Sequence, residues 1–266
     1  MVRRFVLWVT VAGSLALTGC AGMAPGGGVQ TAERPMLDAD PTTDAQRRSK
    51  VHVDLGMAYF EVGRYDLALE AARNALAYES GYPPAHHLMG LVLMMVGDTG
   101  AARTSFQRAL SVAPNDPDFN NSYGWFLCSV GEEQEGLRLL ALAASNPYYR
   151  HATRPYANAG LCHLRLKNEE AARVQFQLAV TVDPGNALAL YHLAGIAYRR
   201  GDYATARGHL VQLHQRRDPT AESAWLGLRT ERRLGNREAA ASYAEQLRGR
   251  FSDSPQFQEM IQGRFE

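Results

Sequence analysis

The chain has 266 residues, of which 46% are hydrophobic and 21% are charged, and this balance is that of an ordinary globular protein. Its formal net charge of +1 gives no electrostatic reason to expect a nucleic-acid partner or adsorption to an anionic surface. Particular segments of the chain, rather than its overall charge, must therefore carry the function.

Residues 1–19 are predicted to be an export signal. An arginine pair precedes the apolar run Phe5–Leu17, which is too short to span a bilayer as a stable helix. The run leads into the tetrapeptide LTGC at residues 17–20, which resembles the lipobox of bacterial lipoproteins and implies cleavage before Cys20 and acylation of its thiol. The alternatives are a plain secretory signal with an incidental cysteine and a twin-arginine signal, whose polar consensus is missing.

Acylation would anchor the protein to a membrane. Two or three acyl chains bind stably, because each buried methylene contributes roughly 0.8 kcal/mol. The residue after Cys20 is Ala21 rather than aspartate, and by resemblance to sorted lipoproteins of Gram-negative bacteria this favours the outer membrane, facing the periplasm. Residues 20–46 are rich in glycine, proline and polar side chains and predict a flexible tether, with the folded domain over 47–266.

Small residues recur through the rest of the chain at a nearly constant interval. A second small residue follows each of them twelve positions later, and a small side chain at both places lets two helices approach closely. Between the two, a glycine is expected to end the first helix in the left-handed conformation. Six positions spaced 34, 34, 36, 34 and 34 residues apart are Gly56, Gly90, Gly124, Gly160, Ala194 and Leu228.

This pattern resembles the tetratricopeptide-repeat (TPR) family, which implies an all-α fold: a TPR solenoid, a right-handed superhelix of six helix-turn-helix repeats. The sixth repeat fits least well, because Leu228 and Glu231 stand where a small and an aromatic residue are usual. An apolar stripe after it predicts a capping helix over 255–266, formed by Phe257, Met260, Ile261 and Phe265. The repeats are expected at residues 49–82, 83–116, 117–152, 153–186, 187–220 and 221–254.

No set of side chains predicts catalysis or metal binding. Eight histidines are present, but no His-Glu-x-x-His, paired CxxC or GxSxG motif occurs. The glycines at residues 26–28 are not a phosphate loop, since no lysine followed by serine or threonine comes after them. The sequence therefore predicts a protein-binding scaffold and no enzyme, with no cofactor and no small-molecule substrate.

Two cysteines remain if Cys20 is acylated. Cys128 and Cys162 both fall near the ends of the first helices of neighbouring repeats, where the two thiols can come within bridging distance. Export would place them in an oxidising compartment, so a disulfide is the favoured prediction. Two buried free thiols are the alternative.

The first helices of repeats one and two predict an apolar partner-binding groove. In TPR proteins the groove is lined mainly by positions 2, 5, 9, 12 and 13 of that helix, and here those positions are unusually apolar. Methionine side chains adapt to irregular partners, although packing between repeats or beneath the tether would also explain them. The same positions in repeats five and six are aromatic and basic, around Trp225. The predicted groove residues are Val53, Met57, Phe60, His87, Leu91, Met94 and Met95.

Two stretches go beyond generic TPR sequence. The first is the motif of Asn120, Asn121, Tyr123, Gly124, Trp125 and Phe126, which continues to Cys128. The second stretch runs from Asn146 through Asn158 and Gly160 to Cys162. With the lipobox they resemble the type IV pilus biogenesis and stability lipoproteins of the PilF/PilW type, although Ser122 stands where members usually carry a further asparagine.

This resemblance implies a pilotin. Such a lipoprotein binds the secretin subunit of the type IV pilus and promotes its targeting to the outer membrane and its multimerisation there. An adaptor in outer-membrane β-barrel assembly, or a regulator of cell-wall enzymes, is the alternative function for an anchored TPR scaffold.

Overall fold

The computed structural model describes residues 32 and 34–265. The predicted signal peptide, the predicted lipidation site at Cys20 and most of the predicted tether lie outside these residues. The chain divides into the units Met1–Gln30 and Thr31–Glu266, and the second unit contains the helices described below. Within the described residues, no helix combines the length and the apolar character that crossing a membrane requires.

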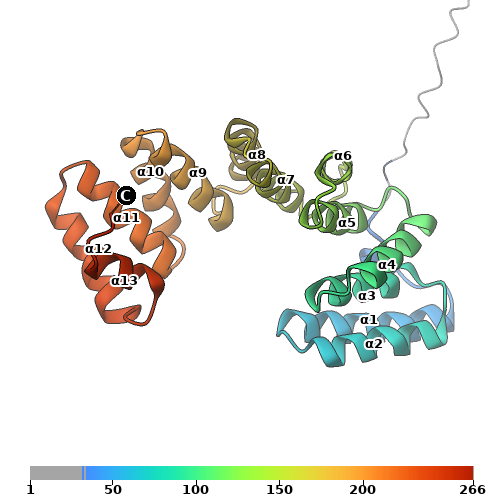
Figure 1. The fold of residues 1–266 in the computed structure, drawn as a ribbon. Coiled ribbons are helices and arrows are strands. Elements are labelled where there is room, and N and C mark those ends of the chain that lie inside the picture. Colours follow the sequence, from blue (N-terminus) through green and yellow to red (C-terminus); the bar gives the residue numbers. More distant parts are fainter. Residues whose placement is uncertain (1–31, 33, 266) are drawn as a thin grey trace, which may run out of the picture. The chain divides into compact units, whose positions relative to one another are not determined.

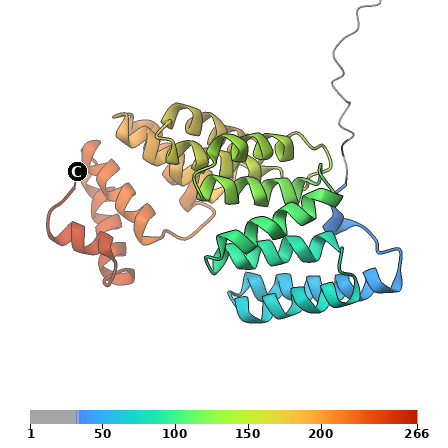
Figure 2. The same cartoon turned by 45° about the vertical axis from the view of Figure 1, so that its right-hand side comes forward.

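Twelve helices between residues 44 and 250 pair into six helical hairpins, and each hairpin packs against the next one along the chain (Figures 1 and 2). Residues 34–265 contain no strand, so the predicted all-α repeat fold is confirmed. The first helices of the hairpins, called A helices, are α1 (Asp44–Glu61), α3 (Pro83–Met95), α5 (Pro117–Ser129), α7 (Thr153–Arg165), α9 (Ala187–Arg199) and α11 (Ala221–Arg233). The B helices are α2 (Tyr65–Tyr78), α4 (Thr99–Val112), α6 (Glu133–Ala144), α8 (Glu169–Val182), α10 (Tyr203–His214) and α12 (Arg237–Arg250).

Glycines end most of the A helices, as the sequence predicts. Gly63, Gly97, Gly131, Gly201 and Gly235 have φ angles between 74° and 89°, a region that is open to glycine and costly for residues with a Cβ. Repeat four departs from this rule, because Lys167 occupies the turn with a φ of 57°. The B helices that follow begin at capping residues: the side chains of Asp98, Asn168 and Asn236 each accept a backbone N–H from the first turn of α4, α8 and α12.

Lys167→Gly is therefore expected to stabilise the fold by about 1 kcal/mol. The substitution removes the left-handed strain of the lysine, and this gain exceeds the extra entropy of glycine in the unfolded chain. Urea unfolding of the two proteins measures the difference. Gly201→Lys, at the equivalent turn of repeat five, is the reverse control and should destabilise; equal stability of all three proteins would contradict the argument.

Small residues set the distance between the two helices of a hairpin. A Cβ on Gly90 would lie 2.8 Å from the Phe106 ring, and one on Gly160 would lie 2.5 Å from the Phe176 ring. In the sixth hairpin, the small residue at the helix contact is Gly227, one position before the predicted position 228. A Cβ on Gly227 would lie 2.5 Å from the Tyr243 ring. The expectation that Leu228 replaces the small residue of this repeat is therefore wrong, because α11 is shifted by one residue in its contact with α12.

The predicted tether is too long at its C-terminal end. Residues 34–43, called the strap, pack against the repeats, and α1 begins at Asp44 rather than near residue 49. Pro35 of the strap is buried, and the η1 turn (Met36–Asp38) follows it. The Met36 N–H donates a 2.7 Å hydrogen bond to Asp116 at the start of α5, and Lys50 Nζ donates to the Leu37 carbonyl at 3.1 Å. Long-range contacts of this kind cannot be read from composition.

The capping segment is a short helix followed by a chain reversal. Helix α13 (Pro255–Ile261) packs against the last hairpin through Phe257 and Met260, as predicted. Ile261 is 60% exposed and does not belong to the apolar stripe, because the helix ends there. Gly263, with a φ of 71°, then turns the chain back so that Phe265 packs against α11.

Candidate partner-binding groove

Five of the seven predicted groove residues form a partly open apolar surface on α1 and α3. Met57 and Phe60 of α1 are half-buried over the core of the first hairpin, where the Phe60 ring lies 5.6 Å from the Tyr65 ring. Leu91 and Met94 of α3 are half-buried against the core of the next repeat, and Met95 is 49% exposed. The A helices of repeats one and two therefore leave methionine and aromatic side chains partly open to a partner.

The other two predicted groove residues are interior. Val53 is 1% exposed and packs with Ala75, Tyr82 and Ala85. His87 is 2% exposed, and its Nε2 lies 2.8 Å from Ser122 Oγ of the next A helix. Both occupy position 5 of their 34-residue repeat, which faces the following repeat. Assigning them to the groove is wrong, because packing between repeats covers this position.

Because His87 is buried, the pKa of its imidazole is lowered. Burial, together with the charge of Arg154, lowers the pKa of His87 to about 3, so the imidazole is neutral in the folded protein at neutral pH. Its ring lies 4.8 Å from the Phe119 ring and joins repeats two and three.

The stability of the protein should therefore fall as the pH drops below 6.5. The unfolded histidine binds a proton near pH 6.5 and the folded one does so only near pH 3, so acid favours the unfolded chain between these values. Between pH 7.5 and 5 the wild type should lose about 2 kcal/mol more than His87→Gln, which keeps a hydrogen-bonding group and does not titrate. Urea unfolding at both pH values tests this, and equal losses would contradict it.

The family motif on α5 is largely part of the interface between repeats. Asn120 Nδ2 donates to the carbonyls of Pro114 and Asp116, both at 2.8 Å, and closes the turn before α5. Asn121 Oδ1 accepts a 3.0 Å hydrogen bond from Asn158 of α7. Tyr123 and Phe126 pack with Phe106, and Gly124 contacts the backbone of Gly136. Trp125 is half-buried beside the cysteines.

The two predicted bridging cysteines are joined. Cys128 of α5 and Cys162 of α7 have an S–S distance of 2.03 Å and Cα atoms 5.6 Å apart, and both residues are fully buried. The bond links two neighbouring A helices. It also requires a glycine on α6, because a Cβ on Gly136 would lie 2.7 Å from Cys128 Sγ.

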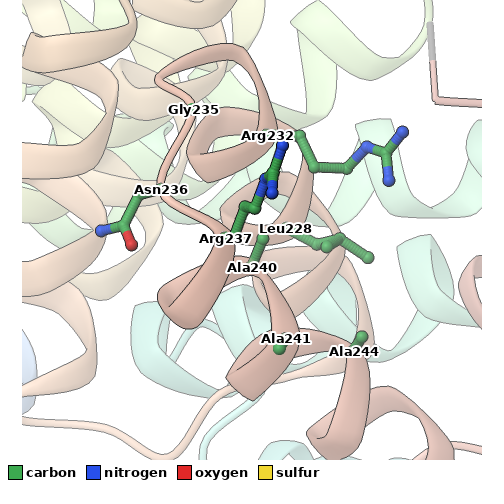
Figure 3. A pocket seen from close by; sticks show the side chains of 8 residues that line it. All are labelled: Leu228, Arg232, Gly235, Asn236, Arg237, Ala240, Ala241 and Ala244. Atoms are coloured by element: carbon green, nitrogen blue, oxygen red, sulfur yellow. The ribbon is translucent and has the colours of Figure 1, made fainter.

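The aromatic and basic end, in repeats five and six, is more closed than its sequence predicts. Trp225 is 8% exposed, because the C-terminal Phe265 covers its ring. A cleft of about 670 Å³ lies nearby between α9 and α11. A second pocket, of about 520 Å³, lies at the α11–α12 turn, where Figure 3 shows Leu228 and Arg232 of α11 together with the alanines of α12.

His86 and His214, two of the histidines in the described residues, form hydrogen bonds within the fold. His86 Nε2 lies 2.9 Å from the Ser80 carbonyl, and His214 lies 3.0 Å from both Ser223 Oγ and Tyr243 Oη. Within residues 34–265, no three histidine, cysteine, aspartate or glutamate side chains come close enough to hold a metal ion. The candidate site is a surface of A helices, and the class of protein that the fold defines is the helical-repeat scaffold.

Comparison with known proteins agrees with this class. Family descriptions of the tetratricopeptide repeat match residues 59–125, 153–186 and 170–222. The type IV pilus assembly protein PilF of Pseudomonas aeruginosa is 25% identical over 246 residues, covering 92% of this chain and 94% of PilF.

Two solved structures have a similar fold. That of Pseudomonas aeruginosa PilF has a TM-score of 0.74 at 24% identity and covers 83% of this chain and 100% of its own. The crystal structure of PilW, a widely conserved type IV pilus biogenesis factor, has a TM-score of 0.72 at 25% identity, over 80% of this chain and 98% of its own. The chain is a tetratricopeptide-repeat protein of the PilF/PilW type.

Proposed function

We propose that this protein is an outer-membrane lipoprotein pilotin, which acts in type IV pilus biogenesis by binding the pilus secretin and promoting its targeting and multimerisation. The similarity to the pilus assembly protein PilF over nearly the whole chain supports a role in pilus biogenesis. The observation that carries the binding step is the apolar surface on α1 and α3, formed by Met57, Phe60, Leu91, Met94 and Met95.

The properties of this surface favour a particular kind of ligand. Its side chains are half-buried, so each has one side packed on the repeat core and the other side available to a partner. Methionine can change rotamer at little cost and so adapts to an irregular apolar ligand. A short amphipathic segment of the secretin would bury its apolar face here and leave its polar face in water.

The lipid anchor supplies the transport step. Acyl chains on Cys20 would carry the bound secretin subunit along the lipoprotein route to the outer membrane. There, several anchored copies would hold several subunits close together, which raises their effective concentration for multimerisation. The protein contributes binding and position, and no covalent step is required.

Replacing Cys20 tests this proposal in a strain that lacks the wild-type protein. Such a strain should contain at least tenfold fewer secretin multimers in its outer membrane, and the wild-type gene should restore them. Cys20→Ser should leave the protein out of the outer-membrane fraction and fail to restore the multimers, while the neighbouring control Ala21→Ser should restore them.

Two results would contradict the proposal. Normal multimers in the strain without the protein would exclude the pilotin role. Normal outer-membrane fractionation of Cys20→Ser would exclude acylation of this cysteine. Co-purification of the secretin with the intact lipoprotein, identified by mass spectrometry, measures the binding step separately.

A further inference from the structure

The side chain of Phe265 packs against α11, the A helix of repeat six, at a site called the seat, which is formed by Trp225 and Arg232. The Phe265 ring lies against the indole of Trp225, with the ring centroids 5.3 Å apart. The guanidinium carbon of Arg232 lies 3.8 Å from the centre of the same ring. Phe265 is therefore held by a tryptophan and an arginine, which is an arrangement that proteins use to bind aromatic groups.

Apart from the contacts of the Phe265 ring, residues 262–265 are held by local hydrogen bonds, to α13 and within the segment, such as that from the Arg264 N–H to the Glu259 carbonyl at 3.0 Å. Helix α13 ends at Ile261, and Gly263 reverses the chain in the left-handed conformation. Residues 262–264 are exposed, so among residues 262–265 the Phe265 ring makes the packing contact with α11. A short tail of this kind can leave its seat without unfolding the last hairpin, whose core is built from α11 and α12.

The seat continues towards an open cleft. Arg229 lies over the Trp225 ring at 5.4 Å and over the Tyr198 ring at 4.9 Å, and its charge acts on Tyr191. Tyr191 lines the cleft of about 670 Å³ between α9 and α11, together with Leu188, which is 42% exposed. The tail thus fills one end of a longer surface and leaves the other end accessible.

Positive charge borders the seat. Arg232 is exposed beside the Phe265 ring and Arg229 lies over the Trp225 ring, whereas Arg233, on the same turns of α11, lies over the Tyr203 ring of α10. The acidic residue of the same turns, Glu231, is 4% exposed and lies 3.7 Å from Arg207 of α10, so it faces away from the seat. At the seat itself, Arg232 favours a ligand with carboxylates beside its aromatic side chain, whereas the cleft is lined by Asp218 and Glu222 together with Arg217.

We propose that the α9–α11 face is a second peptide-binding site, which takes a protein segment with an aromatic side chain flanked by acidic residues, and that Phe265 occupies it in cis. This site is separate from the apolar surface on α1 and α3, and its existence does not depend on the proposed function. A tethered occupant has an effective concentration in the millimolar range, so the tail weakens the binding of an external segment until that segment displaces it.

A labelled peptide with the sequence of residues 254–266 is the probe, and fluorescence anisotropy measures its binding. The chain lacking residues 263–266 and the milder variant Phe265→Ala should both bind the peptide at least tenfold more tightly than the wild-type chain, because their seat is empty. A peptide with Phe265→Ala should bind the truncated chain at least tenfold more weakly. A peptide with Gln262→Glu and Arg264→Glu should bind it at least threefold more tightly.

Charge variants of the truncated chain locate the site. Arg232→Glu should weaken binding at least tenfold, whereas Arg248→Glu, on the exposed side of α12, should leave it unchanged. Circular dichroism and melting of each variant confirm that it is folded.

The proposal fails if the folded truncated chain and Phe265→Ala do not bind the peptide. It also fails if the alanine peptide binds as tightly as the original, or if wild type and truncated chain bind alike. Absence of a gain from the two added glutamates contradicts the assigned charge preference. If light scattering detects dimers of the wild-type chain that Phe265→Ala abolishes, the seat binds the tail of a second copy instead.

Discussion

Replacing Phe60 or Met94 by aspartate is expected to weaken secretin binding at least tenfold. Both side chains are half-buried on the surface of α1 and α3 and present apolar atoms to a partner. Covering one large apolar side chain is worth roughly 1.5–3 kcal/mol, and a carboxylate buried under a ligand adds a desolvation cost. A loss of one to two orders of magnitude in affinity follows from these energies.

The measurement is the amount of secretin co-purified with each variant, together with the secretin multimers in the outer membrane. Leu55→Asp is the matched control, because Leu55 lies on the same helix, is 45% exposed and is not part of the predicted groove. Met95→Asp, at a side chain that is already 49% exposed, should weaken binding with the least effect on folding. Normal multimers with folded Phe60→Asp and Met94→Asp would move the secretin site away from this surface.

Removing the disulfide is expected to produce the largest loss of stability. The bond joins residues 34 apart in sequence, and closing a loop of this size stabilises a fold by roughly 3–4 kcal/mol in the chain-entropy model. Cys128→Ala with Cys162→Ala should lower the free energy of unfolding by about this amount. Cavity formation at two fully buried positions adds to the loss.

Thiol counting separates this prediction from the alternative of two free cysteines. In a Cys20→Ser background, the unfolded and unreduced protein should contain no free thiol, and two free thiols would refute the bond. A reducing agent should destabilise the wild type and leave the double variant unaffected. Helical content by circular dichroism should stay unchanged, because the hairpins fold through their own small-residue contacts.

Much of the fold follows from local sequence rules. The interval between Gly90, Gly124 and Gly160 predicts the hairpins, because each of these glycines meets its nearest partner within the same repeat. The turn glycines are equally predictable, since a positive φ is a property of one residue and its neighbours. The shift of the sixth hairpin to Gly227 has a local signal as well: Gly227 precedes Tyr243 by 16 residues, as Gly90 precedes Phe106.

The candidate site was harder to predict, because exposure depends on the neighbouring repeat. Met57 and Val53 are one helical turn apart and similar in character, yet Val53 is covered by Tyr82 at the junction with the next repeat and by Ala85 within that repeat. His87 looks like a surface residue by composition and is interior because Phe119 and Ser122 of α5 enclose it. Trp225 is covered by the tail after α13. The exposure of these three side chains is mispredicted, because each is covered by residues outside its own helical hairpin.

The strap changes the geometry of anchoring. Arg34, its first residue, lies over the ring of Tyr148 in the loop after repeat three, at 5.8 Å, and Asp38 pairs with Arg150 of the same loop. The chain from a lipidated Cys20 would thus reach the repeats at their third unit rather than at their first helix. Thirteen residues, 21–33, would separate the anchor from this point. A chain of that length extends at most about 45 Å. This is half the span of the predicted tether, which has 26 residues beyond Cys20. With so short a tether, a lipidated protein would stay close to the membrane. It could then bring a bound partner only to proteins within the same distance of the membrane.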